Sequence, residues 1–413
     1  MARATTFKYT VTVVNPGSGN KYYMDGILQT YVTLFPGCTY EFNQDDSSNS
    51  GHPLRFATQV DAANSSEYTT GVTTSGTPGS ATAFTKIEVT TSTPYRLFFY
   101  CTNHSGMGNS VTVPQGTATR AFTGGSYPSL TNTIEAVDLT TTGNTFDFGD
   151  MSASKYATGA IGGTIKGLFL GGSPDGGSTN LNTIDQIIVK SLGNSTDFGD
   201  LVTVTNYPAG LGNQTRGVYG GGYAGGYLNN IGYVTIAANG NATDFGDLTV
   251  ARNQFCGFSS PTRGVWAGGG LPSGQSDVMD YVTIASAGNA TDFGNLISTT
   301  TGTAGTSSST RGVVAGGGTP SLINVIQYVT IASAGNTTDF GDLTVAKSNM
   351  TLNGSNSTIG IFGGGLAPST NVVIDSITFA STGNSQDFGD MINSSNAGGY
   401  GQCGNSNGHG GLQ

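Results

Sequence analysis

Apolar and polar positions beyond residue 120 recur in one pattern of four short runs, and this pattern predicts β-strands throughout. One unit spans residues 252–296. Its runs NQFCGFSS, RGVWAGGG, MDYVTIAS and ATDFGNL have the length and the β-branched and aromatic content of strands. The AGN or TGN turn before the fourth run suits a hairpin, because Gly and Asn tolerate positive φ. No apolar run at helical spacing is long enough to predict a helix.

The same unit occurs six times. The block DFG(D/N) follows itself at steps of 50, 47, 48, 47 and 48 residues, beginning at Asp147, Asp197, Asp244, Asp292, Asp339 and Asp387. Repeats of this length with several short strands each indicate the blades of a six-bladed β-propeller. The series starts at Arg120 with a second strand, RAFTGG, and ends with a first strand, AGGYGQCG (397–404). We therefore expect this C-terminal strand to lie beside RAFTGG and close the ring, which removes open sheet edges.

The DFG block has a structural explanation. Six copies without an HRD sequence exclude the magnesium-binding role that DFG has in protein kinases. We expect the Asp side chains to accept hydrogen bonds from backbone N–H groups at the turns, with a calcium site as the alternative.

Residues 1–113 differ in pattern from the repeats and predict a separate domain. The alternating runs KYTVTVV, TYVTLF, TYEFN, KIEVTT and RLFFYC, separated by turns, fit a small β-sandwich. Residues 114–119 are a plausible linker, so the propeller domain spans 120–413. The predicted fold class is all-β.

One loop of the first domain contains residue types that bind metals. Cys101, His104 and Met107 have the spacing C-x-x-H-x-x-M, in a chain with only three His. Two His and one Cys with a distant Met form the ligand set of blue-copper sites, so a second His must come from elsewhere in the domain. Two alternatives stay open: a packed turn without metal, and a disulfide between Cys38 and Cys101.

The first domain resembles the cupredoxins. The resemblance rests on the run PG-x-T-Y-x-F before the first His and on the C-x-x-H-x-x-M loop, which is similar to that of the amicyanin-like members. It implies a copper ion held by His52, Cys101, His104 and Met107. Pro53 departs from the pattern, since many cupredoxins have Asn there, and a hydrogen-bond donor is then missing beside the site.

The second domain resembles propellers of the kelch type. The resemblance rests on an Arg-led strand, an apolar strand ending in GG and a following strand with an aromatic residue, with the Phe of DFG in place of the usual Trp. Copper enzymes built on such propellers, of the galactose oxidase type, hold their metal with His, whereas this propeller contains only His409. We therefore expect no enzymatic activity.

Charge restricts the partners. Charged residues make up 10% of the chain and its net charge is −10. Eleven of the 18 acidic residues after position 119 belong to the DFG(D/N) blocks. An acidic surface without a basic cluster argues against nucleic acid. No segment has the apolar length of a signal peptide or a membrane span, so we expect no membrane insertion.

The cupredoxin-like module with GHPLRF, followed by Gly-rich DFGD repeats, resembles structural proteins of marine bacteriophages, in particular cyanophages. This implies a virion protein made in the host cytoplasm: a tail fibre, knob or surface-decoration component. It would form a homo-oligomer within an assembly and contact other virion proteins, with a host surface receptor or glycan as a further partner. Candidate contact loops are Gly221–Asn230 and Leu271–Val278. The alternative is a copper-binding electron-transfer protein with a propeller partner domain.

Overall fold

The computed structural model describes residues 6–28, 31–34, 38–90, 93–94, 96–113, 119–127, 129–367, 371–392 and 404–412. It divides the chain into two compact units, Met1–Ala118 and Thr119–Gln413. The described residues form strands and three short 3₁₀ helices but no α-helix, which confirms the predicted all-β class. No described helix has the length and apolar content needed to cross a membrane. The predicted linker lies largely outside the described residues.

The first unit consists of two sheets around one hydrophobic core. The larger has the order β3-β2-β1-β5-β8-β7 and the smaller β4-β10-β9-β6. Their elements are β1 (Thr6–Val14), β2 (Lys21–Met24), β3 (Ile27–Leu28), β4 (Tyr31–Thr33), β5 (Thr39–Asn43), η1 (Ser47–Asn49), β6 (Leu54–Ala57), η2 (Val60–Ser65), β7 (Val72–Ser75), β8 (Phe84–Glu88), β9 (Arg96–Cys101) and β10 (Asn109–Thr112). Phe42 and Ile87 from the larger sheet and Phe56, Leu97 and Phe99 from the smaller are at most 1% exposed and belong to one cluster. Alternation along these strands places their apolar side chains on the inner face.

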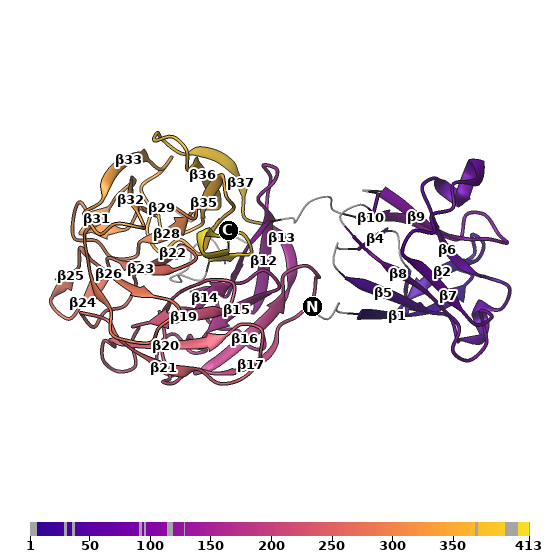
Figure 1. The fold of residues 1–413 in the computed structure, drawn as a ribbon, viewed down its shortest axis with the longest axis horizontal. Helices are drawn as coiled ribbons and strands as arrows, with labels where there is room; N and C mark the ends of the chain where they lie inside the picture. Colours follow the sequence, from indigo (N-terminus) through magenta and orange to yellow (C-terminus); the bar gives the residue numbers. More distant parts are fainter. Residues whose placement is uncertain are drawn as a thin grey trace. The chain divides into compact units, whose positions relative to one another are not determined.

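The described part of the second unit contains six four-stranded antiparallel sheets, which we number in chain order (Figure 1). Sheet 1 has the order β13-β12-β11-β38, sheet 2 β14-β15-β16-β17, sheet 3 β18-β19-β20-β21, sheet 4 β22-β23-β26-β27, sheet 5 β28-β29-β32-β33 and sheet 6 β34-β35-β36-β37. Two short hairpins, β24-β25 and β30-β31, add to them. Figure 1 shows the sheets following one another in sequence order, with the yellow C-terminal segment near the middle of this unit.

The strand bounds agree with the repeated pattern. They are β11 (Arg120–Gly124), β12 (Thr133–Asp138), β13 (Phe146–Asp150), β14 (Gly159–Gly162), β15 (Lys166–Leu170), β16 (Thr183–Ile188), β17 (Thr196–Asp200), β18 (Ala209–Gly212), β19 (Arg216–Gly220), β20 (Asn230–Thr235), β21 (Thr243–Asp247), β22 (Cys256–Ser259), β23 (Arg263–Ala267), β24 (Gly270–Leu271), β25 (Gly274–Gln275), β26 (Val278–Thr283), β27 (Thr291–Asn295), β28 (Ala304–Ser307), β29 (Arg311–Ala315), β30 (Gly318–Thr319), β31 (Ser321–Leu322), β32 (Val325–Thr330), β33 (Thr338–Asp342), β34 (Leu352–Ser355), β35 (Ile359–Gly363), β36 (Val373–Thr378), β37 (Gln386–Asp390) and β38 (Asn405–Ser406). The four strands predicted within residues 252–296 are β22, β23, β26 and β27.

Neighbouring sheets pack face to face. The second strand of each sheet is therefore buried on both sides and nearly continuously apolar, as in RGVWA of β23. One core cluster joins Val265 of sheet 4 to Val314 and Val329 of sheet 5. Another joins Val137 of sheet 1 to Ile361 of sheet 6. The first and last sheets thus share a core in the same way as sequential ones.

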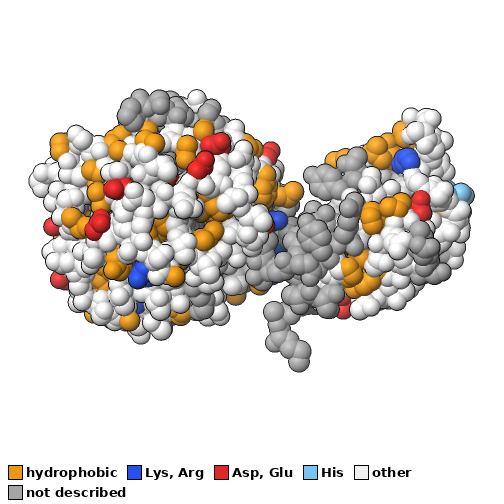
Figure 2. Space-filling model, turned by 90° about the horizontal axis from the view of Figure 1, so that it is seen from above, with side chains coloured by type: hydrophobic (Ala, Val, Ile, Leu, Met, Phe, Trp, Pro, Cys, Tyr) orange, Lys and Arg blue, Asp and Glu red, His pale blue; other side chains and the backbone are white. Residues whose placement is uncertain are grey.

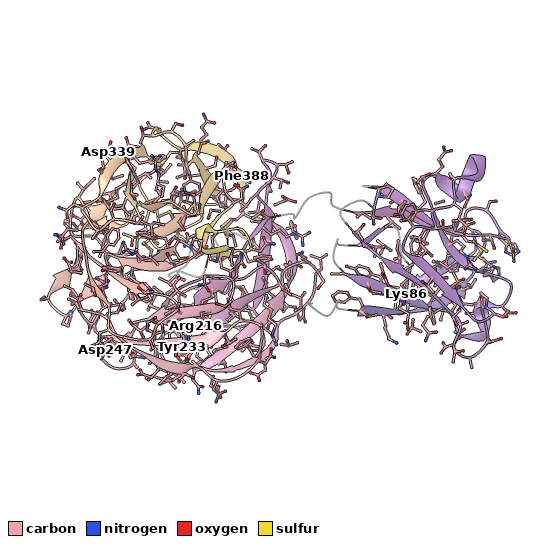
Figure 3. All side chains as sticks on the ribbon, viewed as in Figure 1. Lys86, Arg216, Tyr233, Asp247, Asp339 and Phe388 are labelled. Carbon is pink, nitrogen blue, oxygen red and sulfur yellow. The ribbon has the colours of Figure 1, made fainter. Side chains whose placement is uncertain are left out.

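Side chains also connect the sheets. Figure 3 labels Arg216 beside Tyr233, and the guanidinium carbon lies 4.6 Å from the ring centroid. Arg216 Nη1 also donates to the Ile284 carbonyl oxygen in the next sheet, at 3.1 Å. The same stacking recurs at Arg263 and Arg311. The repeated Arg of the second strand therefore connects its own sheet to the next one.

At every sheet boundary, the DFG(D/N) block of one sheet forms hydrogen bonds with the GN turn of the next sheet. Between sheets 3 and 4, the Gly288 N–H donates to the Phe245 carbonyl oxygen at 2.7 Å, and the Asp247 N–H donates to Asn289 Oδ1 at 3.1 Å. The equivalent Asn side chains at the other boundaries are Asn144, Asn194, Asn241, Asn336 and Asn384, with Asn144 bonded to Asp390 between sheets 1 and 6. The expected capping by Asp is therefore wrong for most copies. Among the six DFG aspartates, only Asp387 accepts such a bond, from the Gly389 N–H at 3.0 Å.

The C-terminal segment completes sheet 1. The partner of β11 is β38, with Asn405 opposite Phe122 and Ser406 opposite Ala121. The predicted strand AGGYGQCG (397–404) lies outside the described residues except for Gly404. The strand beside β11 thus comes from the C-terminal segment as expected, and its described part is Asn405–Ser406.

Candidate metal centre

The register of two strands brings His52 and Cys101 together. Cys101 ends β9 and lies opposite Leu54, the first residue of β6. His52 lies two residues before Leu54, and the Thr102 N–H donates to the Pro53 carbonyl oxygen at 3.2 Å. The chain then turns back after Thr102, so that His104 faces the same thiol.

Three of the four predicted ligands converge. His52, Cys101 and His104 each offer one ligand atom, and these atoms lie within 4.8 Å of one another. Cys101 Sγ is 3.8 Å from His52 Nδ1 and 3.7 Å from His104 Nδ1. The two imidazole rings are 4.6 Å apart between centroids. Within the described part of the chain this is the one such group of His, Cys, Asp or Glu side chains.

These separations fit a shared ion. Metal–sulfur and metal–nitrogen bonds of about 2.3 and 2.0–2.1 Å give a sulfur-to-nitrogen distance of about 3.6 Å at a tetrahedral angle and about 3.8 Å at 120°. The observed 3.7 and 3.8 Å are therefore compatible with Cys101 and each of the two His binding the same ion. Cys101 is 3% exposed, His52 is half-buried and His104 is exposed.

The fourth predicted ligand, Met107, lies on the same loop. It is 3% exposed and belongs to the core of the first unit. Its carbonyl oxygen accepts a hydrogen bond from the Tyr22 N–H at 3.3 Å. The loop is held further at Gly106, whose N–H donates to Asp61 Oδ2 at 2.9 Å and whose carbonyl oxygen accepts from Lys21 Nζ.

His52 is fixed through its backbone. Its carbonyl oxygen accepts hydrogen bonds from Gln44 Nε2 and from the Tyr22 hydroxyl, both at 2.9 Å. Its N–H donates to the Asn49 carbonyl oxygen at 2.8 Å. Burial and the neighbouring His104 lower the pKa of His52. Its imidazole is therefore neutral near pH 7, the form that binds metals.

Sequence reasoning missed these anchoring residues. Gln44, Tyr22 and Asp61 lie far from the C-x-x-H-x-x-M loop in the sequence, and nothing in their local pattern marks them. Gln44 is 1% exposed, and a buried Gln must find hydrogen-bond partners. That requirement is the one signal that could have identified it, once its burial was known.

The disulfide alternative for Cys38 is not formed. Cys38 and Cys101 are not joined by a disulfide in the structure. Because Cys101 forms no disulfide, its sulfur is available as a metal ligand.

The remaining predicted contact regions are loops. In Gly221–Asn230, the rings of Tyr223 and Tyr227 pack edge to face at 5.6 Å. Leu271–Val278 contains the end of β24 and the strand β25. On the face drawn in Figure 2, charged side chains are few and scattered. Neither the two loops nor the surface in Figure 2 identifies a bound partner.

Two comparisons with known proteins found no match. No protein-family model matches the chain, and no curated protein is significantly similar to it. The argument about function therefore rests on the residues themselves.

Proposed function

We propose that the first unit binds a copper ion through His52, Cys101 and His104, with Met107 as a distant fourth ligand. The observation that carries this proposal is that the Cys101 sulfur lies 3.8 Å from His52 Nδ1 and 3.7 Å from His104 Nδ1. A thiolate with two imidazoles suits copper, and a tetrahedral set without a weak axial ligand would suit zinc better.

In this proposal the chain's own residues orient the ligands and limit the access of water. Gln44 and Tyr22 hold the His52 backbone, while Asp61 and Lys21 hold Gly106, next to Met107 in the loop. The bound ion supplies a positive charge that stabilises the Cys101 thiolate. His104 is exposed, so an ion held there would be in contact with solvent on that side.

Copper titration tests the proposal. Adding Cu(II) to the purified protein should produce an intense visible thiolate-to-copper band that is absent in Cys101→Ser and much reduced in His104→Ala. Cys256→Ala is the matched control, because Cys256 is a buried free thiol of the second unit, and it should keep the band. No band in the wild-type protein, or the same band in Cys101→Ser, would contradict copper binding at this centre.

We further propose that the six sheets form one closed six-bladed β-propeller of the kelch type that serves as a rigid binding platform. Support comes from the bond between Asn144 and Asp390 and from the core that sheets 1 and 6 share. Limited proteolysis tests closure, since a closed ring should resist cleavage at β11 and β37 as strongly as at β23.

We also propose that the chain is a structural or adhesion protein of a phage particle, a tail fibre, knob or surface-decoration component. The low charge, the Gly-, Ser- and Thr-rich composition and the cyanophage resemblance support this. The cupredoxin-like domain would dock onto the particle and the propeller would project toward a host receptor or glycan. A map of the particle with the propeller against the capsid or tail core would contradict this arrangement.

Electron transfer is the second candidate for the metal centre. It is favoured by one observation: the His104 side is exposed and borders a cavity of about 280 Å³ that Lys21, Ser105 and Met107 also line. A reduction potential that allows rapid, reversible cycling of the copper-loaded protein would support it, and a copper centre that no reductant reaches would exclude it.

A further inference from the structure

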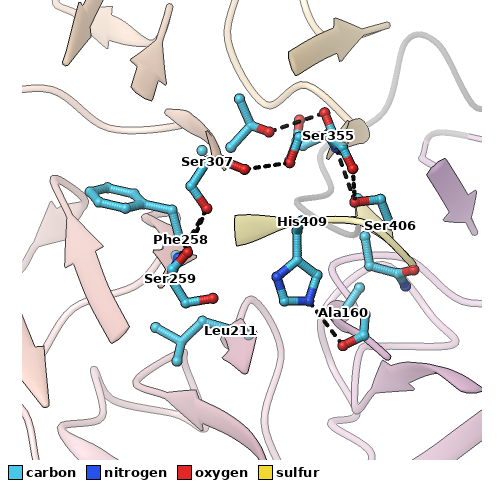
Figure 4. A pocket seen from close by; sticks show the side chains of 17 residues that line it. Ala160, Leu211, Phe258, Ser259, Ser307, Ser355, Ser406 and His409 are labelled. Atoms are coloured by element: carbon cyan, nitrogen blue, oxygen red, sulfur yellow. Dashed lines mark hydrogen bonds between the residues drawn. The ribbon is translucent and has the colours of Figure 1, made fainter. Parts of the chain in front are cut away.

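The last described residues lie inside the second unit. Beyond β38, residues Gly410–Leu412 form a 3₁₀ turn, η3, that contacts β18, β22 and β28. All three residues of η3 are buried, and Leu412 is 8% exposed. His409, between β38 and η3, lines the same small cavity as Ser259, Ser307 and Ser355 (Figure 4). The segment 404–412, which we call the C-terminal latch, thus belongs to sheet 1 and contacts strands of the five other sheets.

Serine hydroxyls connect the latch to the ends of the innermost strands. Ser406 Oγ donates to the Ser355 carbonyl oxygen at 2.9 Å, Ser355 Oγ to that of Ser307 at 2.8 Å, and Ser307 Oγ to that of Ser259 at 2.8 Å. Ser259 Oγ continues to the Gly212 carbonyl oxygen at 2.7 Å. The latch therefore begins a chain of equivalent bonds that passes from sheet 1 through sheets 6, 5 and 4 to sheet 3.

The fit of the latch leaves no room for larger residues. A Cβ atom at Gly410 would lie 2.1 Å from the Ser308 carbonyl oxygen, and one at Gly411 would lie 1.9 Å from that of Gly212. Backbone atoms cannot move aside as a flexible side chain can. Glycine at these two positions is what permits the close approach to the surrounding strands.

His409 satisfies both ring nitrogens in a single neutral tautomer. Nε2 lies 3.0 Å from the Gly162 carbonyl oxygen, which can only accept, so Nε2 carries the proton. Nδ1 lies 3.2 Å from the Gly411 N–H, which can only donate, so Nδ1 must be unprotonated. A second proton on Nδ1 would point at the Gly411 N–H and remove that bond.

The described residues around the His409 ring offer no charge to compensate a second proton on it. The cavity is lined by Gly, Ala, Leu, Phe, Thr, Ser and Asn from β14, β18, β22, β28, β34 and β38 and its flanks, and His409 is the one titratable residue among the described residues that line it. Burial lowers the pKa of His409, and the bond to Gly162 opposes this only in part. The imidazolium form is thus disfavoured by desolvation as well as by the lost bond.

We propose that the C-terminal latch is an acid-sensitive switch: it closes sheet 1 while His409 is neutral and is released when His409 takes up a proton. Release removes β38 from β11 and leaves sheet 1 with three strands and an open edge. The inference uses the local contacts of the second unit and is independent of the metal centre. It depends on the proposed ring only in that the latch spans the boundary between sheets 1 and 6.

The sign of the pH dependence follows from linkage. The released segment binds a proton below the ordinary His pKa of about 6.5, whereas the closed form binds it only at lower pH. The equilibrium constant that favours the closed form is therefore highest above about pH 6.5. It falls by about tenfold for each pH unit below that value, until the lowered pKa of the closed form is reached. Carboxyl groups titrate mainly below pH 5, so this window belongs to His409 among the groups at the latch.

Hydrogen exchange read by mass spectrometry tests the switch on the full chain. Protection of peptides covering 404–412, corrected for intrinsic exchange rates, should fall about tenfold per pH unit between pH 6.5 and 5, while β32 peptides keep their protection. His409→Gln retains a donor and an acceptor but does not titrate. In this variant the protection of the latch should not depend on pH.

Two results would overturn the proposal. One is equal protection of the wild-type latch at pH 7 and pH 5. The other is the same pH slope in His409→Gln as in the wild-type protein. If the variant does not fold, an NMR titration of the wild-type His409 ring decides instead: a pKa well below 6.5 supports the switch, and a pKa at or above 6.5 refutes it.

Discussion

Replacing Lys347 by Met should destabilise the second unit by about 3–5 kcal/mol. Lys347 Nζ lies 2.7 Å from Asp375 Oδ2, and both side chains are fully buried. The ammonium also donates to the carbonyl oxygens of Phe362 and Val373 at 3.2 and 3.1 Å. The substitution preserves the apolar stem but leaves a buried carboxylate without its cation, which is the costly way to break such a pair. Out of a total stability of about 5–15 kcal/mol, this is a large fraction.

Fluorescence of the single Trp gives a suitable assay. Trp266 is fully buried in β23 of the same unit, so its emission during urea denaturation reports the unfolding of this unit alone. Lys190→Met is the control, because Lys190 is half-buried and belongs to no ion pair among the described residues. Its effect should stay within about 0.5 kcal/mol. A Lys347→Met protein within 1 kcal/mol of wild type would refute the reasoning.

The same variant has a predicted pH dependence. Burial opposes ionisation of Asp375, but Lys347 and the hydrogen bonds from Ser385 and Thr344 outweigh it and lower the pKa of this carboxyl below 3.8. Without Lys347 the effect of burial has much less opposition and the pKa rises, so the carboxyl is readily protonated in mild acid. The difference in stability between wild type and Lys347→Met should therefore shrink as the pH falls from 7 toward 4. A constant difference would show that the cost is lost packing and not an unpaired charge.

Three further substitutions test the sheet boundaries and the metal centre. Asn289→Ala removes one cross-sheet hydrogen bond and should lower the urea-derived stability by about 0.5–1.5 kcal/mol; no change would mean that solvent replaces the bond. Gly246→Ala should cost more than 2 kcal/mol, because its Cβ would lie 2.5 Å from the Gly288 backbone, whereas Gly143→Ala, with open space around it, should be nearly neutral. Gln44→Ala releases the His52 carbonyl oxygen and should weaken copper binding by about 10–100-fold in a competition titration; unchanged affinity would mean that Tyr22 suffices.

The strands of the second unit could be predicted because the sequence repeats them six times. A motif such as DFG(D/N) followed by GN is visible without any structure. Which of its side chains forms the bond between sheets is not, because Asp and Asn both accept backbone hydrogen bonds in turns. The structure assigns this role to Asn289 and its equivalents, because their amide oxygens face the N–H of the neighbouring strand.

The bounds of the closing strand could not be predicted for a similar reason. AGGYGQCG and the segment after it both have the small, polar composition of an innermost strand, so composition does not fix the register. Ser406 and His409 decide it, through bonds to strands up to 247 residues away. Such long-range contacts leave no periodic signal around residue 405.

At the candidate metal centre, spacing identified Cys101 and His104, whereas His52 came from the resemblance to the cupredoxins; the structure brings these three side chains together. The short loop between Cys101 and His104 limits their separation, and the register of β6 and β9 does the same for His52. The anchors could not be predicted, because Gln44, and likewise Asp61, contact the centre only after the two sheets have packed. The local sequence therefore reveals candidate ligands that lie on one loop. The residues that anchor the loop become visible only in the packed structure.

Buried ion pairs recur in every second sheet from sheet 2 to sheet 6, a pattern longer than the single-sheet repeat. The buried cations occupy equivalent positions in sheets 2, 4 and 6, where they pair with acids of the third strand, while sheets 3 and 5 have Gly232 and Gln327 in the acid positions. The pairs are Lys155–Asp185, Arg252–Asp280 and Lys347–Asp375. Removing one partner of a buried ion pair is costly, so in sheets 2 to 6 the two positions change together. Sheet 1 departs from this alternation, because Glu135 occupies its acid position and accepts a hydrogen bond from Thr145 Oγ1. The single-sheet period therefore describes the strands and turns of this domain but not its buried charges.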